Sequence, residues 1–153
     1  MVSKSKKTTK AKKQGRPKKT KKDSFIYAVG RRRTATAQVR LYPDKKGGIT
    51  VNNKPIEEYF PGETLKKLYL PPLRVCNVID KYLITAKVNG SGKIGQLEAV
   101  IHGISRALIS LDKEKFRPIL KKRGFLTRDS RMKERRKVGM GGKARRKKQS
   151  PKR

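Results

Sequence analysis

The sequence has few of the residues on which disulfide bonding, metal binding and membrane insertion depend. It contains one cysteine, Cys76, and one histidine, His102. A single cysteine permits no intramolecular disulfide and no thiol-rich metal site, so we expect a reducing intracellular compartment. No apolar run approaches the roughly 20 residues of a transmembrane helix. The N-terminus lacks the apolar segment of a secretory signal, so we expect none.

Acidic residues are also scarce. Eleven Asp and Glu residues stand against 44 Lys and Arg residues, which gives a formal net charge of +33. Self-repulsion on this scale opposes compaction unless a polyanion neutralises it. Nucleic acid is such a polyanion, because a duplex carries one negative charge about every 1.7 Å of its axis. The composition therefore favours a protein that binds nucleic acid.

The positive charge is concentrated at the two ends of the chain. Residues 1–24 carry a net charge of +10, residues 25–120 carry +9 and residues 121–153 carry +14. Apolar residues lie mostly in the middle, and segments without them cannot bury enough surface to fold. We therefore expect a disordered basic extension over residues 1–24, a globular core over 25–124 and an extended basic tail over 125–153.

Four segments alternate between apolar and polar residues, as half-buried strands do. They are residues 25–29, 34–41, 49–51 and 82–88. Gly30, just after the first segment, predicts a bulge or a bend. We expect these strands to form a single four-stranded sheet.

The strongest helical pattern follows Gly95. Large apolar residues recur there at spacings of three and four, which places them on one face of a long helix. They are Ile94, Leu97, Ile101, Ile104, Leu108 and Leu111. Small residues lie beside this stripe and permit the close approach of a neighbouring backbone. They are Ala99, Gly103 and Ala107.

Shorter helices complete the predicted fold. We expect them near residues 55–60, at 63–70 with a stop at Pro71-Pro72, and at 112–122, where Pro118 should bend or shorten the last helix. Strands and helices in this order predict an α+β fold, with helices packed on one face of the sheet.

No pattern of catalytic residues stands out. Gly90-Ser91-Gly92-Lys93 has the Gly-Lys pair of a nucleotide-binding loop, but Lys87 and Ile94 occupy the positions of its first glycine and its Ser or Thr. We expect instead a glycine turn whose amides and Lys93 meet an RNA phosphate. The sequence predicts no enzyme activity, no cofactor, no metal site and no small-molecule substrate.

Two arginine-containing patterns are candidates for RNA contact. Arg31-Arg32-Arg33 lies in strand-forming sequence, so at least one of these side chains leaves the core side of the sheet. Guanidinium groups bind phosphates in bidentate fashion and stack on bases. The alternative is an edge strand made soluble by charge. His102 and Arg106 lie one helical turn apart, where both can point outward toward an anion or form a solvated surface pair.

The N-terminal segment leaves a DNA-binding function open. Gln14-Gly15-Arg16-Pro17 is similar to a minor-groove hook, although Gln14 stands where such a hook has arginine. Basic blocks usually bind without sequence choice, which favours an electrostatic arm. A general DNA-binding or chromatin-like protein is the main alternative to an RNA-binding one. An RNA-modifying or nucleotide-using enzyme, which rests on the glycine turn, is the third hypothesis.

Taken together, several motifs resemble the S-nine family of small-subunit ribosomal proteins. The resemblance covers about residues 25–153, and it is specific because the motifs occur in order with few gaps. The motifs are residues 29–35, 49–55, 58–60, 102–108, 126–129, 131, 134–137, 143–145 and 152–153. The chain departs from the family at Ser150-Pro151, where an aromatic residue and Ser are usual, and at Met140-Gly141-Gly142.

The resemblance implies a fold like that of the second domain of ribosomal protein five, a four-stranded sheet with helices on one face. It also implies a structural role in the small subunit of a cytoplasmic ribosome, with an organellar ribosome left open. The partners would be rRNA of the subunit head (the 3′ major domain), neighbouring head proteins and the peptidyl-site tRNA. A 29-residue tail is able to span at most roughly 100 Å when extended. No membrane contact is expected.

The residues expected to bind nucleic acid follow from these patterns and from the resemblance. For rRNA they are Arg31, Arg32, Arg33, Lys93, His102, Arg106, Arg128, Arg131, Arg135, Arg136, Lys137, Lys143, Arg145 and Arg146. For tRNA they are Lys152 and Arg153 at the end of the tail.

Overall fold

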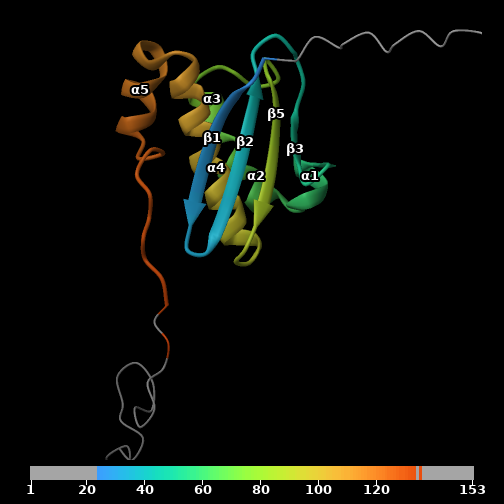
Figure 1. Ribbon diagram of the computed structural model, residues 1–153, viewed down its shortest axis with the longest axis vertical. Helices are drawn as coiled ribbons and strands as arrows, with labels where there is room; N and C mark the ends of the chain where they lie inside the picture. The colour runs from blue at the N-terminus through green and yellow to red at the C-terminus, as the bar shows by residue number, and fades with distance from the viewer. Residues whose placement is uncertain (1–23, 134, 136–153) are drawn as a thin grey trace, which may run out of the picture.

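The computed structural model describes residues 24–133 and residue 135, which form an α+β fold built on one mixed sheet (Figure 1). Its strands lie in the order β1-β2-β5-β3-β4. β3 runs parallel to β5, and the other neighbours are antiparallel. The strands are β1 (Ile26–Arg32), β2 (Ala35–Tyr42), β3 (Ile49–Val51), β4 (Lys54–Pro55) and β5 (Leu83–Asn89).

The sheet has five strands, so the prediction of four was wrong in number. All four predicted strands are present as β1, β2, β3 and β5. The additional strand, β4, is only two residues long and pairs with β3. Asn52 and Asn53 form the turn between these strands with φ angles of 48° and 65°, as tight hairpin turns require. A two-residue strand is too short to show a period, and the sequence at Pro55 predicted only the helical turn that follows.

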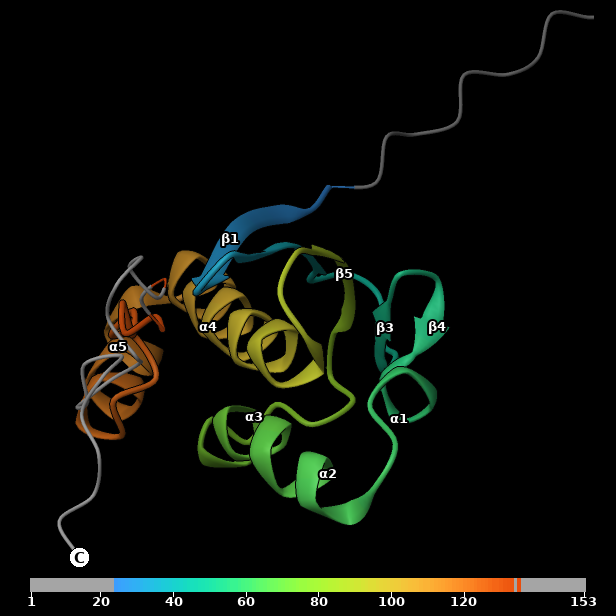
Figure 2. The same ribbon diagram turned by 90° about the horizontal axis from the view of Figure 1, so that it is seen from below.

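In the described part of the chain, five helices accompany the sheet. α2, α3 and α4 lie on one side of it, with α4 next to the strands (Figure 2). Pro71-Pro72 ends α2 as predicted but also begins α3, since proline fits the first turn of a helix. Pro118 does not shorten the last helix, which has the predicted extent. The helices are α1 (Ile56–Tyr59), α2 (Glu63–Tyr69), α3 (Pro71–Val75), α4 (Lys93–Leu111) and α5 (Lys113–Lys122).

Gly30 allows α4 to lie directly on the sheet. The pairing of β1 with β2 is one-to-one from Ile26 to Arg32, so the predicted bulge at Gly30 is absent. Instead, a Cβ atom on Gly30 would overlap the Ala99 carbonyl and the Gly103 amide of α4. The predicted close approach at the small residues of the long helix is therefore confirmed, and β1 is the backbone that approaches them.

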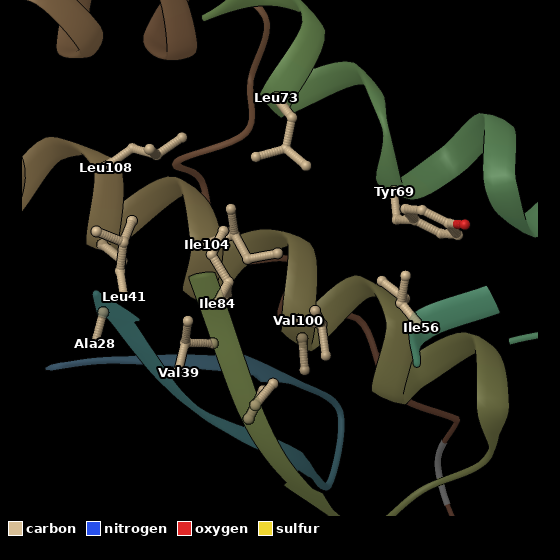
Figure 3. Packing of buried hydrophobic residues seen from close by; sticks show 14 of the residues in the cluster. Ala28, Val39, Leu41, Ile56, Tyr69, Leu73, Ile84, Val100, Ile104 and Leu108 are labelled. Carbon is tan, nitrogen blue, oxygen red and sulfur yellow. The ribbon is translucent and has the colours of Figure 1, made fainter. Parts of the chain in front are cut away.

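The core surrounds α4. Figure 3 shows α4 between Ala28, Val39 and Ile84 of the sheet and Leu73 of α3. Ile94, the first residue of the predicted apolar stripe, is 58% exposed because it lies in the first turn of α4. Within the described part of the chain, no helix is both long and apolar enough to cross a membrane.

Candidate nucleic-acid interface

β1 is an edge strand, and side chains of α4 cover part of its open edge. Among residues 24–133, β1 pairs only with β2, so backbone groups on its other side need different partners. The Arg31 backbone N–H donates to His102 Nδ1 at 3.3 Å. The Arg106 guanidinium donates to the Val29 carbonyl. His102 and Arg106 therefore face the strand edge, which corrects the expectation that both point outward, although Arg106 remains exposed.

The surroundings of His102 favour its neutral form. Burial lowers the pKa of its imidazole, and the positive charge of Arg106 lowers it further. Nδ1 accepts the hydrogen bond from Arg31, so it must keep its lone pair. The ring also has a hydrogen bond with the backbone of Leu126. His102 thus connects β1 with residues 124–131, the segment after α5 that we call the tail root.

Arg32 holds the tail root against the core. Its side chain is only 8% exposed and lies at the end of β1. One guanidinium nitrogen pairs with the Glu98 carboxylate of α4, and a second lies 3.0 Å from Asp129 Oδ2. The third donates to the Arg131 carbonyl at 2.6 Å. These contacts form what we call the Arg32 clamp, which joins β1, α4 and the tail root through one side chain.

Asp129 is the second carboxylate of the clamp. It accepts hydrogen bonds from the Arg131 backbone N–H at 2.9 Å and from Arg131 Nη2 at 2.7 Å. These bonds, together with the charges of Arg131 and Arg32, hold the pKa of Asp129 well below its usual range. The carboxylate is therefore ionised at neutral pH and pairs with a guanidinium on each side.

The exposed arginines surround the clamp. Arg31 and Arg33 are exposed on either side of Arg32, so the prediction that at least one arginine of the triplet leaves the core side is confirmed. Arg128 and Arg135, also exposed, come from the tail root and the residues after it. A hollow of about 170 Å³ lies between β1, α4 and the tail root and is bordered by Arg31 and Arg128. This arrangement presents cations to an anionic partner while the clamp neutralises the buried charge.

The glycine turn lies beside the β1–β2 turn but does not bring Lys93 to the clamp. A Cβ atom on Gly90 would overlap the Thr34 carbonyl, which shows how closely the two turns approach. The Lys93 ammonium instead donates to the Tyr59 carbonyl at 3.2 Å and lies 4.0 Å from the centre of the Tyr59 ring. The predicted contact of Lys93 with an RNA phosphate stays a prediction. In the structure, Tyr59 of α1 already holds the Lys93 side chain.

The sequence reasoning missed Glu98 as a partner of Arg32, although a signal for it exists. Glu98, His102 and Arg106 are spaced four residues apart on α4, so they lie on one face of the helix. That polar face contacts the edge of β1 and the end of the Arg32 side chain. A stripe of polar residues on an otherwise buried helix indicates that the helix covers a polar partner.

Several predicted residues lie outside the described part of the chain. The N-terminal segment 1–23 is outside it as well, so neither the predicted arm nor its hook has a structural description. Among the described residues, no group of three or more His, Cys, Asp or Glu side chains is arranged to hold a metal ion. The predicted contact residues outside the description are Arg136, Lys137, Lys143, Arg145, Arg146, Lys152 and Arg153.

Known proteins resemble this chain over most of its length. The proteins named small ribosomal subunit protein uS9 from Desulfovibrio desulfuricans and Maridesulfovibrio salexigens are each 51% identical to it over 118 residues, 77% of this chain and 89% of theirs. The protein of the same name from Lawsonia intracellularis is 51% identical over 116 residues, 76% of this chain and 88% of its own. A family model described as Ribosomal protein S9/S16 matches residues 30–153, which include β1, α4 and the tail root. The chain therefore belongs to the ribosomal protein S9/S16 family.

Proposed function

We propose that this protein is a structural component of the small ribosomal subunit and binds rRNA of the subunit head with the exposed arginines around the Arg32 clamp. The main support for this proposal is the exposure of Arg31, Arg33 and Arg128 beside the clamp. The charge of Arg32 itself is neutralised by Glu98 and Asp129. The relatives named small ribosomal subunit proteins support the assignment. Because the family is one of ribosomal proteins, the protein has a structural role, not an enzymatic one.

The clamp prepares the arginines for binding before RNA arrives. A cation on a free chain must give up conformational freedom when it binds a phosphate, and this loss opposes association. Here Arg128 lies on a segment that Arg32 and His102 hold to the core. Arg31 lies on a strand whose edge His102 already holds. Less entropy is therefore lost when these guanidinium groups meet phosphates, and each contact also releases counterions from the RNA.

We further propose that the tail beyond the clamp reaches the peptidyl-site tRNA with Lys152 and Arg153. The resemblance to the S-nine family suggests this role. The clamp supports it because it fixes the point on the core from which the tail departs. The 22 residues after Arg131 would span at most roughly 75 Å if fully extended. An extended tail would therefore be needed to carry Lys152 and Arg153 over this distance from the core.

The assignment to the small subunit is tested by sedimentation. A tagged full-length copy is expressed in cells, and the lysate is separated on a sucrose gradient with and without ribonuclease. We expect the protein to co-migrate with small subunits and to leave those fractions after ribonuclease treatment. Migration with DNA that survives ribonuclease but not deoxyribonuclease would support the chromatin-like alternative and contradict the proposal.

A further inference from the structure

One face of the sheet carries no helix of the described residues. Alternate residues of β1, β2 and β5 point away from α4, and the strand register aligns them across the sheet. Figure 2 shows the helices α2, α3 and α4 on the other side. We call these outward-pointing residues the open face. Its three rows are Tyr27, Arg40 and Thr85, then Val29, Gln38 and Lys87, then Arg31, Thr36 and Asn89.

The charge on the open face has one sign. Each row contains one cation, Arg40, Lys87 or Arg31, and all three are exposed. None of the five strands contains an aspartate or a glutamate. Charges across an interface are complementary, so the partner of this face should carry negative charge. A surface with three cations and no carboxylate is complementary to a polyanion.

Tyr27 is an exposed aromatic residue on this face. It is 50% exposed and has no ring contact, hydrogen bond or ion pair within the described residues. Its direct cross-strand neighbour is Arg40. The Arg40 guanidinium lies 5.1 Å from the centre of the Phe25 ring, and Phe25 is 45% exposed. Tyr27 thus provides a free aromatic ring at one end of the open face, and beside it lie Arg40 and the partly exposed Phe25, whose ring also contacts the Tyr42 ring.

We propose that the open face is a second rRNA-binding site and that it takes unpaired nucleotides. Bases stack on Tyr27 and Phe25, while Arg40 and Lys87 bind the phosphates between them. A paired helix presents phosphates and hydroxyls but keeps its bases stacked inside, so a free aromatic ring adds nothing to its binding. Unpaired bases expose their faces, and aromatic side chains on a sheet bind them without strict sequence choice. This inference rests on the proposed function, because it names the RNA class that this part of the protein meets.

The role of the Tyr27 ring is tested with two substitutions in the full-length protein. Tyr27→Val removes the ring but keeps a residue suited to strands, and Tyr27→Phe keeps the ring. We expect Tyr27→Val to weaken binding to the 3′ major domain of small-subunit rRNA roughly ten-fold, within the range for loss of one stacked base. Tyr27→Phe should bind like the wild type. Neither substitution should change binding to a fully paired RNA duplex, and thermal unfolding confirms that both variants fold.

The cations are tested against matched controls. Arg40→Gln with Lys87→Gln removes two charges from the open face, and Arg74→Gln with Lys81→Gln removes two exposed charges elsewhere. The slope of log affinity against log salt for the same rRNA should become shallower by about 1.4 to 1.8 in the open-face variant only. Equal slopes in the two variants would show that the open face contributes only to the total charge of the protein. This result would contradict the proposed binding site.

Ultraviolet crosslinking in purified small subunits separates this proposal from the assignment to the subunit. We expect a nucleotide attached to the peptide that contains Tyr27. Crosslinks of this peptide to a neighbouring protein, or RNA crosslinks confined to residues 128–135, would overturn the open-face site while the assignment to the subunit stands. Absence of the protein from purified small subunits would instead contradict the proposed function itself.

Discussion

Arg32 differs from its neighbours Arg31 and Arg33 in what its guanidinium group binds. The three residues are chemically identical and adjacent. Arg31 and Arg32 point to opposite sides because strand residues alternate between faces, whereas Arg33 lies in the turn after β1 with a φ angle of 52°. A buried guanidinium group must be paired, since an isolated buried charge is costly. Glu98, Asp129 and the Arg131 carbonyl provide this pairing. The triplet therefore combines one residue that holds the tail root with two that face solvent.

Substitution of Arg32 tests this difference directly. Arg32→Met should lower the free energy of unfolding by about 1–3 kcal/mol, toward the lower end because the partner carboxylates are partly exposed. It should also make the tail root more sensitive to proteolysis. Arg31→Met is the matched control and should change the free energy by less than about 0.5 kcal/mol. Urea unfolding and limited proteolysis measure both effects, and equal behaviour of the two variants would contradict the clamp.

His102 should make stability depend on pH. Its pKa is lowered in the folded protein, so the unfolded chain binds the proton more tightly. The free energy of unfolding should therefore be constant above pH 7 and should fall as pH drops below the ordinary histidine value of about 6.5. His102→Gln should remove this fall, because glutamine does not titrate. Urea unfolding between pH 5.5 and 8 tests this, and an unchanged fall in the variant would assign the effect to other groups.

At the scale of elements, the contact between α4 and β1 organises the molecule. Gly30 and Gly103 bring the two backbones together, so the polar stripe of α4 reaches the edge of β1. The free edge of a strand is a template for unwanted pairing, and covering it with side chains prevents this. The same contact places Glu98 beside Arg32. Packing of one helix on one strand thus creates both the edge cover and the clamp.

The close contact between β1 and α4 predicts that one methyl group added at Gly30 has a large effect on the free energy of unfolding. Gly30→Ala should lower the free energy of unfolding by about 1–3 kcal/mol, because the added Cβ meets backbone atoms of α4 that have no room to move. Gly48→Ala is the matched control, since no atom lies within 4 Å of its added Cβ. Urea unfolding of both variants gives the comparison. A Gly30→Ala variant as stable as the wild type would show that α4 shifts easily.

Elements with a local sequence pattern could be predicted, whereas features that depend on very short segments or on distant contacts could not. Four strands and the long helix could be predicted because the alternation in 34–41 and the stripe in 97–108 are local. β4 was missed because two residues carry no period. The role of Gly30 was misjudged because the reason for a glycine lies across the fold, in Ala99 and Gly103.

The candidate site was only partly predictable for the same reason. Its exposed cations could be predicted from the residues of the triplet and from the family resemblance. The pairing inside the site could not, because Arg32 and Asp129 are 97 positions apart and become neighbours only when α4 lies against β1. Local patterns identify charged residues, whereas tertiary packing decides which of them are available to RNA.

At the scale of the whole molecule, the core and the tail should have separable roles. The described cations lie on the core, on the tail root and on the residues just after it, whereas Lys152 and Arg153 end the chain. Deletion of these two residues should leave incorporation into small subunits intact and weaken tRNA binding at the peptidyl site, because one or two charge-assisted contacts are lost. Purified small subunits from the truncated strain are titrated with tRNA. Normal tRNA affinity with a reduced yield of subunits would assign the tail end to assembly instead.

The whole molecule should also bind rRNA in a strongly salt-dependent way. If the full chain neutralises ten phosphates, log affinity should fall against log salt with a slope of about −7 to −9. Filter binding of the 3′ major domain rRNA over a salt series measures the slope. A slope near zero would show that the net charge of +33 takes little part in binding.

The role of the arginines around the clamp is tested most directly by the same binding measurement on two variants of equal charge. One variant replaces Arg31, Arg33 and Arg128 with Gln, and the other makes the same change at Arg74, Lys81 and Arg117, which are also exposed but take no part in the contacts of the clamp. If RNA binds to the arginines around the clamp, only the first variant should lose about 2 to 3 units of salt slope. Equal losses in both variants would contradict this role, because binding would then depend on total charge and not on the arginines around the clamp.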